Sequence, residues 1–331
     1  MKFIFLVTIL SVLTISNSAW SWGDLGHSAV GEIAERNLTK KGKEFVQSIL
    51  GIEPLALAAT WPDHVRDDAR FKAFTPYHFW DMPAGFSSFT QLSEATQREE
   101  KDAHTIIGQA HKLLVGSKLS KKQKMILMRY FIHVVGDVHQ PLHLGNPIDQ
   151  GGNLCSVKLK GETKTMNLHS FWDTYIVESS KLTWGKTGYF TYNDLVGMIL
   201  KDIPAPNEIT GTPIEWYDET RKLLSVVYPD GKTPLAPEER EYCRRIDPTT
   251  RMRVDGKYDE SKIKPLDDEY IAMALPIVKK QILLGGLRLA SMLNKMGEQY
   301  KAHDYMDEKK IIDGVLIKNS SDRTPQSKSK K

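Results

Sequence analysis

The sequence predicts a mainly α protein, a single compact helical domain with a small β-hairpin insert. Apolar residues recur three and four positions apart along most of the 331-residue chain, a spacing typical of amphipathic helices. One stretch alone, "CSVKLKGETKTMNL", alternates as paired strands do. No internal repeat or linker divides the about 310 residues beyond the N-terminal leader, a length that suits one large domain or two small ones.

The first 21 residues have the pattern of a secretory signal peptide. Lys2 gives a positive start, Phe3–Ile15 is apolar, and Ala19-Trp20-Ser21 offers small residues at the two positions that a signal peptidase inspects. The alternative is an uncleaved membrane anchor, but the apolar run is shorter than the about 20 residues of a comfortable span. We therefore expect a secreted or periplasmic protein that begins at Trp22, with no membrane association after cleavage because no later segment looks apolar for long enough.

Five segments beyond the leader place apolar side chains at helical spacing with charged residues between them. These segments are residues 28–50, 92–115, 122–139, 168–180 and 266–296. The polar, turn-rich stretch 247–265 predicts a long surface loop. The final "KNSSDRTPQSKSKK", residues 318–331, lacks the apolar content to pack and predicts a disordered basic tail, which leaves residues 22–317 as the domain.

Charge and cysteine content exclude little. The formal charge of +4 comes from 45 basic and 41 acidic residues, too slight a balance to predict a polyanionic partner by itself. Cys155 and Cys243 lie outside any CxxC pattern, which argues against a cysteine-zinc site, and the sequence leaves open whether they pair in an oxidising compartment. Asn37 and Asn319 begin glycosylation acceptor patterns, which matter only in a host that glycosylates.

The stretch "RYFIHVVGDVHQPLHLGNPIDQGGN" carries the most chemistry. His133 and Asp137 stand four apart on a helical pattern, so their side chains point from one face. Pro141 ends that helix, and His143 follows in the exit turn. A single pair of this kind is as readily a surface hydrogen bond or a helix cap. A second pair with the same spacing, His169 and Asp173 in "NLHSFWD", favours a shared metal site.

Imidazole and carboxylate are the ligands of catalytic zinc sites, whereas calcium and magnesium prefer oxygen cages. Two upstream stretches, "ATWPDHVRDDARFKAFTPYHFWD" and "WGDLGH", supply further candidates, namely Asp63, Arg66, His78, Asp81 and His27. His139 falls on the far side of the helix, where we expect it to support a ligand or to be solvated. We leave out His64 beside Asp63, and expect surface positions for His104, His111 and His303.

Together these motifs resemble a known family. "HVVGDVHQPLHLGN…GGN", "NLHSFWD", "WPDHVR", "TPYHFWD" and an N-terminal Trp-Gly-x-x-Gly-His are similar to the zinc-dependent single-strand nucleases of fungi and plants, the S-one/P-one type, also called 3′-nucleotidases. The likeness runs from Trp22 to the terminal helical segment, nearly all of the mature chain. It implies the phospholipase C/nuclease-like helical fold.

The resemblance also implies a cluster of three zinc ions. The first would be held by Asp63, His78, His133 and Asp137, and the second by His143, His169 and Asp173. The third would take His27, Asp137 as a bridge, and the amino nitrogen and carbonyl oxygen of Trp22. An internal peptide nitrogen has no free lone pair, so leader removal would create this ligand and the uncleaved precursor should be poorly active.

By the same resemblance, a zinc-activated hydroxide attacks phosphorus in line with the departing 3′ oxygen. Asp63 and Arg66 are the implied catalytic residues, with the planar fork of Arg66 on phosphate oxygens. Phe79 would stack on a nucleobase, and Asp81 would accept hydrogen bonds from the base edge. The competing interpretations are a surface ion pair of Arg66 with a neighbouring aspartate, and a core packing role for Phe79.

The expected activity is cleavage of single-stranded DNA and RNA to 5′-nucleotides, with removal of 3′-phosphates from 3′-nucleotides as a second reaction. The alternatives are a zinc-dependent phospholipase C, which shares the scaffold, and a secreted zinc-binding protein without turnover. "HQPLH" and "NLHxxWD" favour the nuclease, and Arg66 beside the cluster argues weakly against a mere zinc binder. Trp80 is bulkier than the family pattern, which leaves base preference open.

Overall fold

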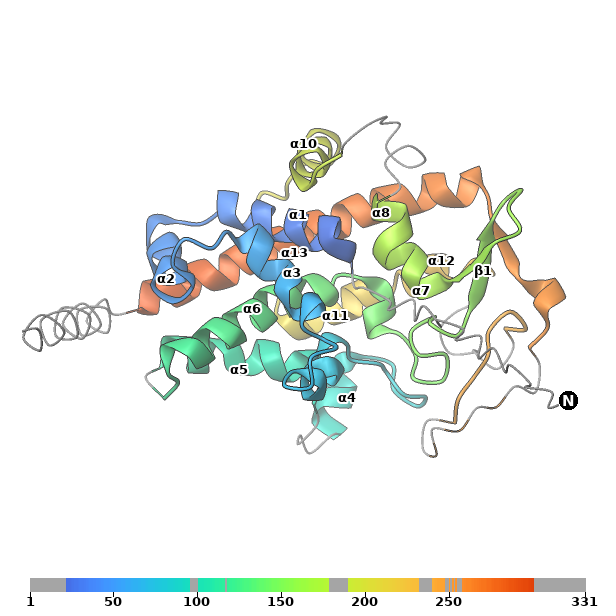
Figure 1. The fold of residues 1–331 in the computed structure, drawn as a ribbon, viewed down its shortest axis with the longest axis horizontal. Helices are drawn as coiled ribbons and strands as arrows, with labels where there is room; N and C mark the ends of the chain where they lie inside the picture. The colour runs from blue at the N-terminus through green and yellow to red at the C-terminus, as the bar shows by residue number, and fades with distance from the viewer. Residues whose placement is uncertain are drawn as a thin grey trace, which may run out of the picture.

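The computed structural model describes residues 22–95, 101–116, 118–178, 190–231, 240–247, 250, 252, 254 and 258–300. The expected signal peptide, the basic tail, Asn319 and His303 lie outside the described residues. Helices dominate the described part, with one small sheet at one end of the molecule (Figure 1). The prediction of a mainly α fold with a small β insert is confirmed.

The long helix α13 (Asp268–Gln299) forms the spine of the fold (Figure 1). It packs against α1 (Gly23–Arg36) and α2 (Lys40–Leu50), while α3 (Leu55–His64) lies between α1 and α6 (Lys121–Asp137). Helix α5 (Ala103–Val115) covers the other side of α6. Apolar residues from all these helices join one core, which holds α6 and the residues that follow it.

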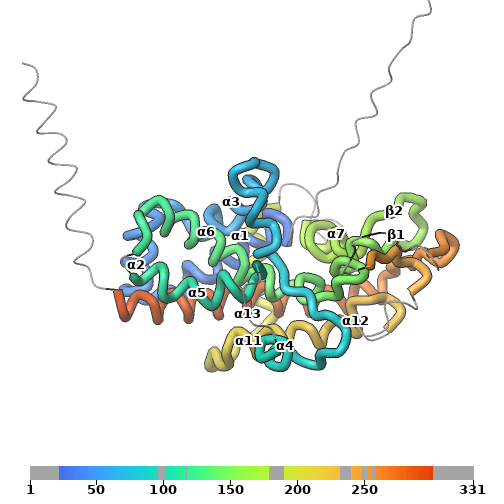
Figure 2. Tube along the Cα trace, turned by 90° about the horizontal axis from the view of Figure 1, so that it is seen from below, coloured from blue at the N-terminus to red at the C-terminus, as the bar shows by residue number. Residues whose placement is uncertain are grey.

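Shorter elements surround this bundle (Figure 2). They are η1 (Lys72–His78), α4 (Phe89–Ala95), η2 (Pro141–Leu144), α7 (Leu168–Ser170), the π-helical turn η3 (Phe171–Tyr175), α8 (Ile176–Glu178), α10 (Tyr192–Asp202), α11 (Pro213–Arg221), α12 (Leu224–Val227) and η5 (Glu260–Lys262). Helix α4 packs on α11, and α11 packs on η2.

Local sequence explains where the main helices begin and end. Ser120 and Gln123 form a reciprocal capping box that starts α6. The side chain of Thr39 caps α2, which divides the predicted helix 28–50 into α1 and α2. Pro141 follows α6 and opens η2, as the proline predicts. Within the predicted helix 168–180, residues 168–178 form a helix interrupted by a π-helical turn, a feature that often occurs at functional sites.

The β insert is larger than a hairpin. Strand β1 (Ser156–Leu159) pairs antiparallel with β2 (Thr165–Asn167), which confirms the predicted hairpin, and parallel with β3 (Lys264–Leu266). The prediction of loop up to residue 265 is therefore wrong at its end, because pairing with β1 orders Lys264 and Pro265. Cys155 and Cys243 form a disulfide that ties β1 to the stretch before that loop.

Helix α13 also corrects one expectation. Its length and composition would allow a membrane span, so the expectation that no segment beyond the leader is apolar for long enough is wrong. Its apolar face, however, packs on α1 and α2, and Arg288 is buried within it. A long helix that packs one face into the core of a globular fold can be as apolar as a membrane span, because its apolar residues are buried in protein.

Candidate metal centre and active-site pocket

The end of α6 and the turn after it bring three predicted ligands together. His133 Nε2 lies 3.3 Å from Asp137 Oδ2. The Nδ1 atoms of His133 and His143 donate to the carbonyls of Ala59 and His78, at 2.6 and 2.7 Å. A carbonyl can only accept, so the proton lies on Nδ1 and Nε2 is the atom that each ring turns toward the cluster. Such outer hydrogen bonds fix the tautomer and orientation of a metal-binding imidazole.

Helix α3 and η1 add two more ligands on the same side. His78 Nδ1 lies 2.9 Å from His133 Nε2 and 3.2 Å from Asp137 Oδ2. Asp63 Oδ1 is 3.7 Å from His133 Nε2 and 3.9 Å from His78 Nδ1. All four side chains are buried. The structure thus brings together the full set predicted for the first zinc ion.

The second predicted set combines His143 of η2, His169 of α7 and Asp173 of the π-helical turn η3. His169 Nε2 lies 2.9 Å from Asp173 Oδ2, and its Nδ1 donates to the carbonyl of Gly151 at 2.7 Å. His143 Nε2 lies 3.7 Å from Asp173 Oδ1. Gly151 has a φ of 57°, and a Cβ there would meet the carbonyl oxygen of Leu142. The glycine therefore allows the loop to approach His169 this closely.

Trp22 and His27 approach the cluster from α1. The indole Nε1 of Trp22 donates to the carbonyl of Gly136 at 2.9 Å. His27 stacks on His133 with ring centroids 3.8 Å apart, and its Nε2 lies 3.3 Å from Asp137 Oδ1. Both residues are fully buried. The structure therefore places Trp22 and His27 at the end of α6, where Asp137 also faces the first set; the Trp22 carbonyl accepts from the Gly26 amide at 3.0 Å.

The donor set fits zinc on chemical grounds. Buried carboxylates are costly unless they are paired or bind a metal. Among the described residues, the buried atoms Asp63 Oδ1 and His143 Nε2 have no hydrogen-bond partner. Burial opposes ionisation of Asp137, yet the imidazoles of His133 and His143 hold its pKa well below its usual range. A site that stabilises negative charge in this way suits a divalent cation bound through nitrogen and oxygen.

Ligand atoms within 4.8 Å of one another form three usable groups. These are His27, Asp63 and His133; His78, His133 and Asp137; and His143, His169 and Asp173. A fourth group contains Asp149 and both cysteines, but the disulfide occupies the sulfur atoms. Several metal ions can therefore be held side by side at the end of α6.

A pocket of about 360 Å³ opens directly onto these groups. Seven predicted site residues line it from the cluster and from the loop around η1. The lining includes Asp63, Arg66, His78, Phe79, Asp81, His143 and His169, together with Gln150 and Asn153. A half-enclosed pocket that combines a cationic side chain, an aromatic ring and buried metal ligands suits an anionic, base-bearing substrate.

Comparison with known proteins identifies the family to which almost the whole described chain belongs. The family model described as S1/P1 Nuclease matches residues 22–298. The chain belongs to the S1/P1 nuclease family. It is 25% identical to Endonuclease 4 of Arabidopsis thaliana over 89% of this chain and 95% of that protein. Nuclease S1 of Aspergillus oryzae is 25% identical (87% and 96%), and Nuclease P1 of Penicillium citrinum 26% (83% and 97%). The protein is therefore an enzyme, a hydrolase of the nuclease class.

The aromatic ring predicted to meet a base lies at the surface of this pocket. Phe79 is 37% exposed, so the alternative of a core aromatic is wrong for this residue. Its carbonyl accepts from the Ala103 amide at 3.1 Å, which anchors the backbone to α5. The neighbouring Trp80 is 4% exposed and packs on Phe89 and Tyr217 instead. The bulky Trp80 thus points into the core and leaves the pocket to Phe79.

Asp81 and Arg66 both line this pocket. Arg66 precedes η1 in the chain and Asp81 follows it. The amides of Trp80 and Met82 donate to the carbonyls of His143 and Gly145, at 2.9 and 3.1 Å, which fixes Asp81 beside η2. Desolvation, with the nearby Asp149 carboxylate, raises the pKa of Asp81 to about 7. Arg66 is half-buried on the pocket wall, whereas Asp68 forms its ion pair with Arg70.

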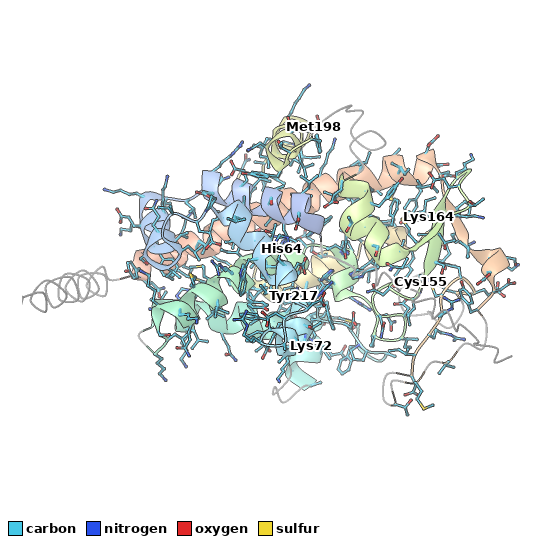
Figure 3. The ribbon with its side chains drawn as sticks, viewed as in Figure 1. His64, Lys72, Cys155, Lys164, Met198 and Tyr217 are labelled. Carbon is cyan, nitrogen blue, oxygen red and sulfur yellow. A yellow bond between two sulfur atoms is a disulfide. The ribbon has the colours of Figure 1, made fainter. Side chains whose placement is uncertain are left out.

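Four other histidines separate clearly from the cluster. His64 is exposed at the end of α3 (Figure 3) and pairs with Asp24 at 2.9 Å, as its exclusion requires. His111 reaches Gln299 Oε1 at 2.8 Å. Two expectations are wrong. His104 is not a free surface residue, because its ring packs on Trp80 and Tyr217. His139 is fully buried rather than solvated; its Nδ1 donates to the Val135 carbonyl of α6, and its Nε2 accepts from Arg288 of α13.

Sequence reasoning missed two residues that brace the site. Gln140 is fully buried and contacts both the Leu142 amide and Asp173. Arg221 of α11 donates from Nη1 to the carbonyls of Leu144 and Gly145, each at 2.5 Å. Gln140 lies inside the quoted "HQPLH" motif, so its position beside two ligands was a usable signal. The sequence around Arg221 carried no such signal, because the role of Arg221 depends on packing between distant segments.

Proposed function

We propose that this nuclease is a secreted or periplasmic zinc enzyme that cuts single-stranded DNA and RNA to 5′-nucleotides and removes 3′-phosphates from 3′-nucleotides. The observation that carries the proposal is the convergence of eight buried nitrogen and oxygen ligands from α1, α3, η1, α6, η2 and the π-helical segment beside one pocket. The names of the S1 and P1 relatives, both nucleases, support the reaction class.

Three zinc ions would be shared among the side chains of this cluster. Asp63, His78, His133 and Asp137 would hold one, and His143, His169 and Asp173 another. His27, Asp137 and the main-chain nitrogen and oxygen of Trp22 would hold the third. Asp137 suits a bridging role because its Oδ2 faces His133 and His78, while its Oδ1 lies 3.3 Å from His27 Nε2.

When bound, adjacent zinc ions lower the pKa of a shared water and so supply a nucleophile near neutral pH. Arg66 would bind non-bridging phosphate oxygens with its planar guanidinium and hold phosphorus in line with the departing 3′ oxygen. Asp63 lies one turn away on the same pocket wall and carries the opposite charge to Arg66. It would orient the attacking oxygen. Burial of the ligands excludes bulk water and strengthens these electrostatic contacts.

The exposed Phe79 ring would stack on an unpaired base, and Asp81 would accept hydrogen bonds from the base edge. Stacking on an aromatic platform is worth roughly 1 to 3 kcal/mol per base and tolerates any base, because every base has a π-face. A base within a duplex is already stacked and paired. Recognition through Phe79 therefore favours single strands.

The proposal is tested with secreted protein whose N-terminus is verified as Trp22. It is incubated with a single-stranded oligonucleotide, with the same sequence as a duplex, and with a 3′-nucleotide, and the products are identified by mass spectrometry. We expect fragments ending in 5′-phosphate from the single strand, loss of cleavage with a zinc chelator, and recovery on adding zinc. Zinc-loaded protein that leaves the oligonucleotide intact but hydrolyses a phosphatidylcholine vesicle would overturn the proposal in favour of a phospholipase C.

A further inference from the structure

Gln140 is a fully buried polar side chain next to the candidate metal ligands. It follows α6 and caps η2, where its Oε1 accepts from the Leu142 amide at 2.6 Å. Its Nε2 donates to Asp173 Oδ1. Buried amides without partners are costly, so both ends of this side chain are specified by the fold.

The orientation of the amide follows from chemistry. A backbone N–H can only donate, so the atom of Gln140 that faces Leu142 must be the carbonyl oxygen. The NH₂ group then necessarily faces Asp173, a carboxylate that can only accept when ionised. A glutamate at this position would place a second negative charge against Asp173, and an apolar residue would leave the carboxylate without this donor.

Asp173 is held from two sides. Its Oδ2 lies 2.9 Å from His169 Nε2, and its Oδ1 lies 3.7 Å from His143 Nε2 and receives the Gln140 NH₂. With Oδ1 fixed by a donor, the carboxylate cannot rotate freely about its side-chain bonds. One neutral amide therefore sets the angle at which Asp173 faces the two imidazoles.

Gln140 also joins parts of the chain that are distant in sequence. It lies 33 positions from Asp173, between the α6–η2 junction and the π-helical turn η3. The first segment supplies Asp137 and His143, while η3 supplies Asp173 and the adjoining α7 supplies His169. A single side chain thus sets the spacing between the two halves of the cluster.

We propose that Gln140 is a positioning residue that orients Asp173 and thereby sets the zinc affinity of the His143, His169 and Asp173 group. This inference rests on the proposed function, in which that group holds zinc. Outer partners of metal ligands typically change metal affinity by about 10- to 100-fold when removed. We expect an effect of this size at one ion and little change at the ions held by the other ligands.

The test compares Gln140→Leu with a matched control, Gln281→Leu. Gln281 is another buried glutamine, 2% exposed, whose Oε1 accepts from the hydroxyl of Thr220 rather than touching a candidate ligand. Zinc affinities are measured by competition with a chromogenic chelator, and stoichiometry by native mass spectrometry. We expect Gln140→Leu to weaken one zinc by about 10- to 100-fold, and Gln281→Leu to match the wild type.

Coupling to Asp173 separates positioning from a general packing effect. In an Asp173→Ala background, which removes the acceptor of the Gln140 NH₂, Gln140→Leu should change zinc affinity by less than about twofold, because the pair interaction is already removed. Gln140→Glu, which keeps the side-chain volume, should weaken the same zinc at least as much as Gln140→Leu, and it provides the comparison if the leucine variant fails to fold.

Two results would overturn the inference. One is a Gln140→Leu or Gln140→Glu protein with all zinc affinities equal to those of the wild type. The other is an equal loss for Gln140→Leu in the presence and absence of the Asp173 carboxylate. Failure of the proposed function is distinguishable: without a zinc site the wild-type protein binds no zinc in the competition assay, and a zinc-loaded wild type that leaves the oligonucleotide intact fails as a nuclease whatever the Gln140 variants show.

Discussion

The end of α6 sets two buried imidazoles in different surroundings. His133 and His139 each donate from Nδ1 to a backbone carbonyl, at 2.6 and 2.7 Å. They differ in what Nε2 meets. That atom of His133 faces carboxylates and another imidazole, whereas that of His139 accepts from Arg288 Nη1 at 3.0 Å. Burial alone therefore does not mark a metal ligand, since a lone pair already engaged by a donor is not available to a cation.

The surroundings of His139 form a closed network behind the site. Arg288 also donates to Glu219 and lies over the ring of Trp216. Burial and the neighbouring Arg288 lower the pKa of His139 to about 3. Around His143, by contrast, Asp137 and Asp173 overcome the effect of burial and raise the pKa to about 9. One side of the α6 terminus is arranged to reject a cation and the other to attract one.

The largest expected effect comes from removing the shared carboxylate. Asp137→Asn keeps the side-chain size but removes the negative charge that faces both His133 and His27. We expect the single-turnover cleavage rate to fall by on the order of 1,000-fold, beyond the loss of a single electrostatic contact. A variant within tenfold of the wild type would show that the cluster is not the reaction centre.

Blocking the new N-terminus should have the next largest effect. A chain that retains Ser21 before Trp22 replaces a free amine with an amide nitrogen, which has no available lone pair. We expect roughly 100-fold slower cleavage, comparable to loss of a group that stabilises the leaving oxygen. The control is the same preparation trimmed back to Trp22 by a protease, and unchanged activity in the extended chain would remove the amine from the metal centre.

Arg66 tests the pocket side of the cluster. Arg66→Ala should lower kcat/KM by about 100-fold, or about 3 kcal/mol of transition-state stabilisation. The matched control is Arg70→Ala, because Arg70 is exposed and its ion pair with Asp68 should contribute little. Steady-state kinetics on a dinucleotide compare the two. Equal behaviour of the two variants would indicate that Arg66 is a surface charge.

Phe79 should affect binding more than chemistry. Phe79→Ala should raise KM for a single-stranded substrate by roughly 5- to 150-fold, the equivalent of about 1 to 3 kcal/mol of stacking. Phe79→Trp, which keeps a ring in the half-exposed position, should retain most of the affinity. If the alanine variant loses kcat with KM unchanged, the ring supports the fold of the pocket instead of binding a base.

The smallest effect on function is expected behind the site. His139→Gln should keep the full zinc content, because its Nε2 serves Arg288 rather than an ion. Loss of that buried contact should lower the free energy of unfolding by about 1 to 3 kcal/mol. Urea unfolding and zinc analysis measure the two quantities. Zinc loss without destabilisation would erase the distinction between the two histidines.

The candidate site was predictable because its ligands lie in short, local patterns. The spacing of His133 with Asp137, and of His169 with Asp173, follows from helix periodicity and needs no knowledge of the fold. The pairing of distant segments was not predictable in this way. The resemblance, and not the spacing, indicated that Asp63 and His78 would meet the α6 ligands, and the Cys155–Cys243 disulfide remained open until the structure placed the two residues together.

Where prediction failed, long-range packing decided the outcome. His139 follows a helix that is buried on more than one side, so periodicity could not distinguish a solvated face from one covered by α13. Lys264 carries no strand signal, but the edge of β1 orders it as part of β3. The strand, the buried histidine and the brace formed by Gln140 all depend on contacts between residues far apart in the chain.

Zinc stoichiometry tests the central claim most directly. Native mass spectrometry of the chain that begins at Trp22 is compared for the wild type, Asp137→Asn and His139→Gln. The account predicts three zinc ions in the wild type and in His139→Gln, and fewer in Asp137→Asn. A wild-type chain that binds no zinc, or an Asp137→Asn chain that keeps all three ions while His139→Gln loses one, would contradict the assignment of the two sides of α6.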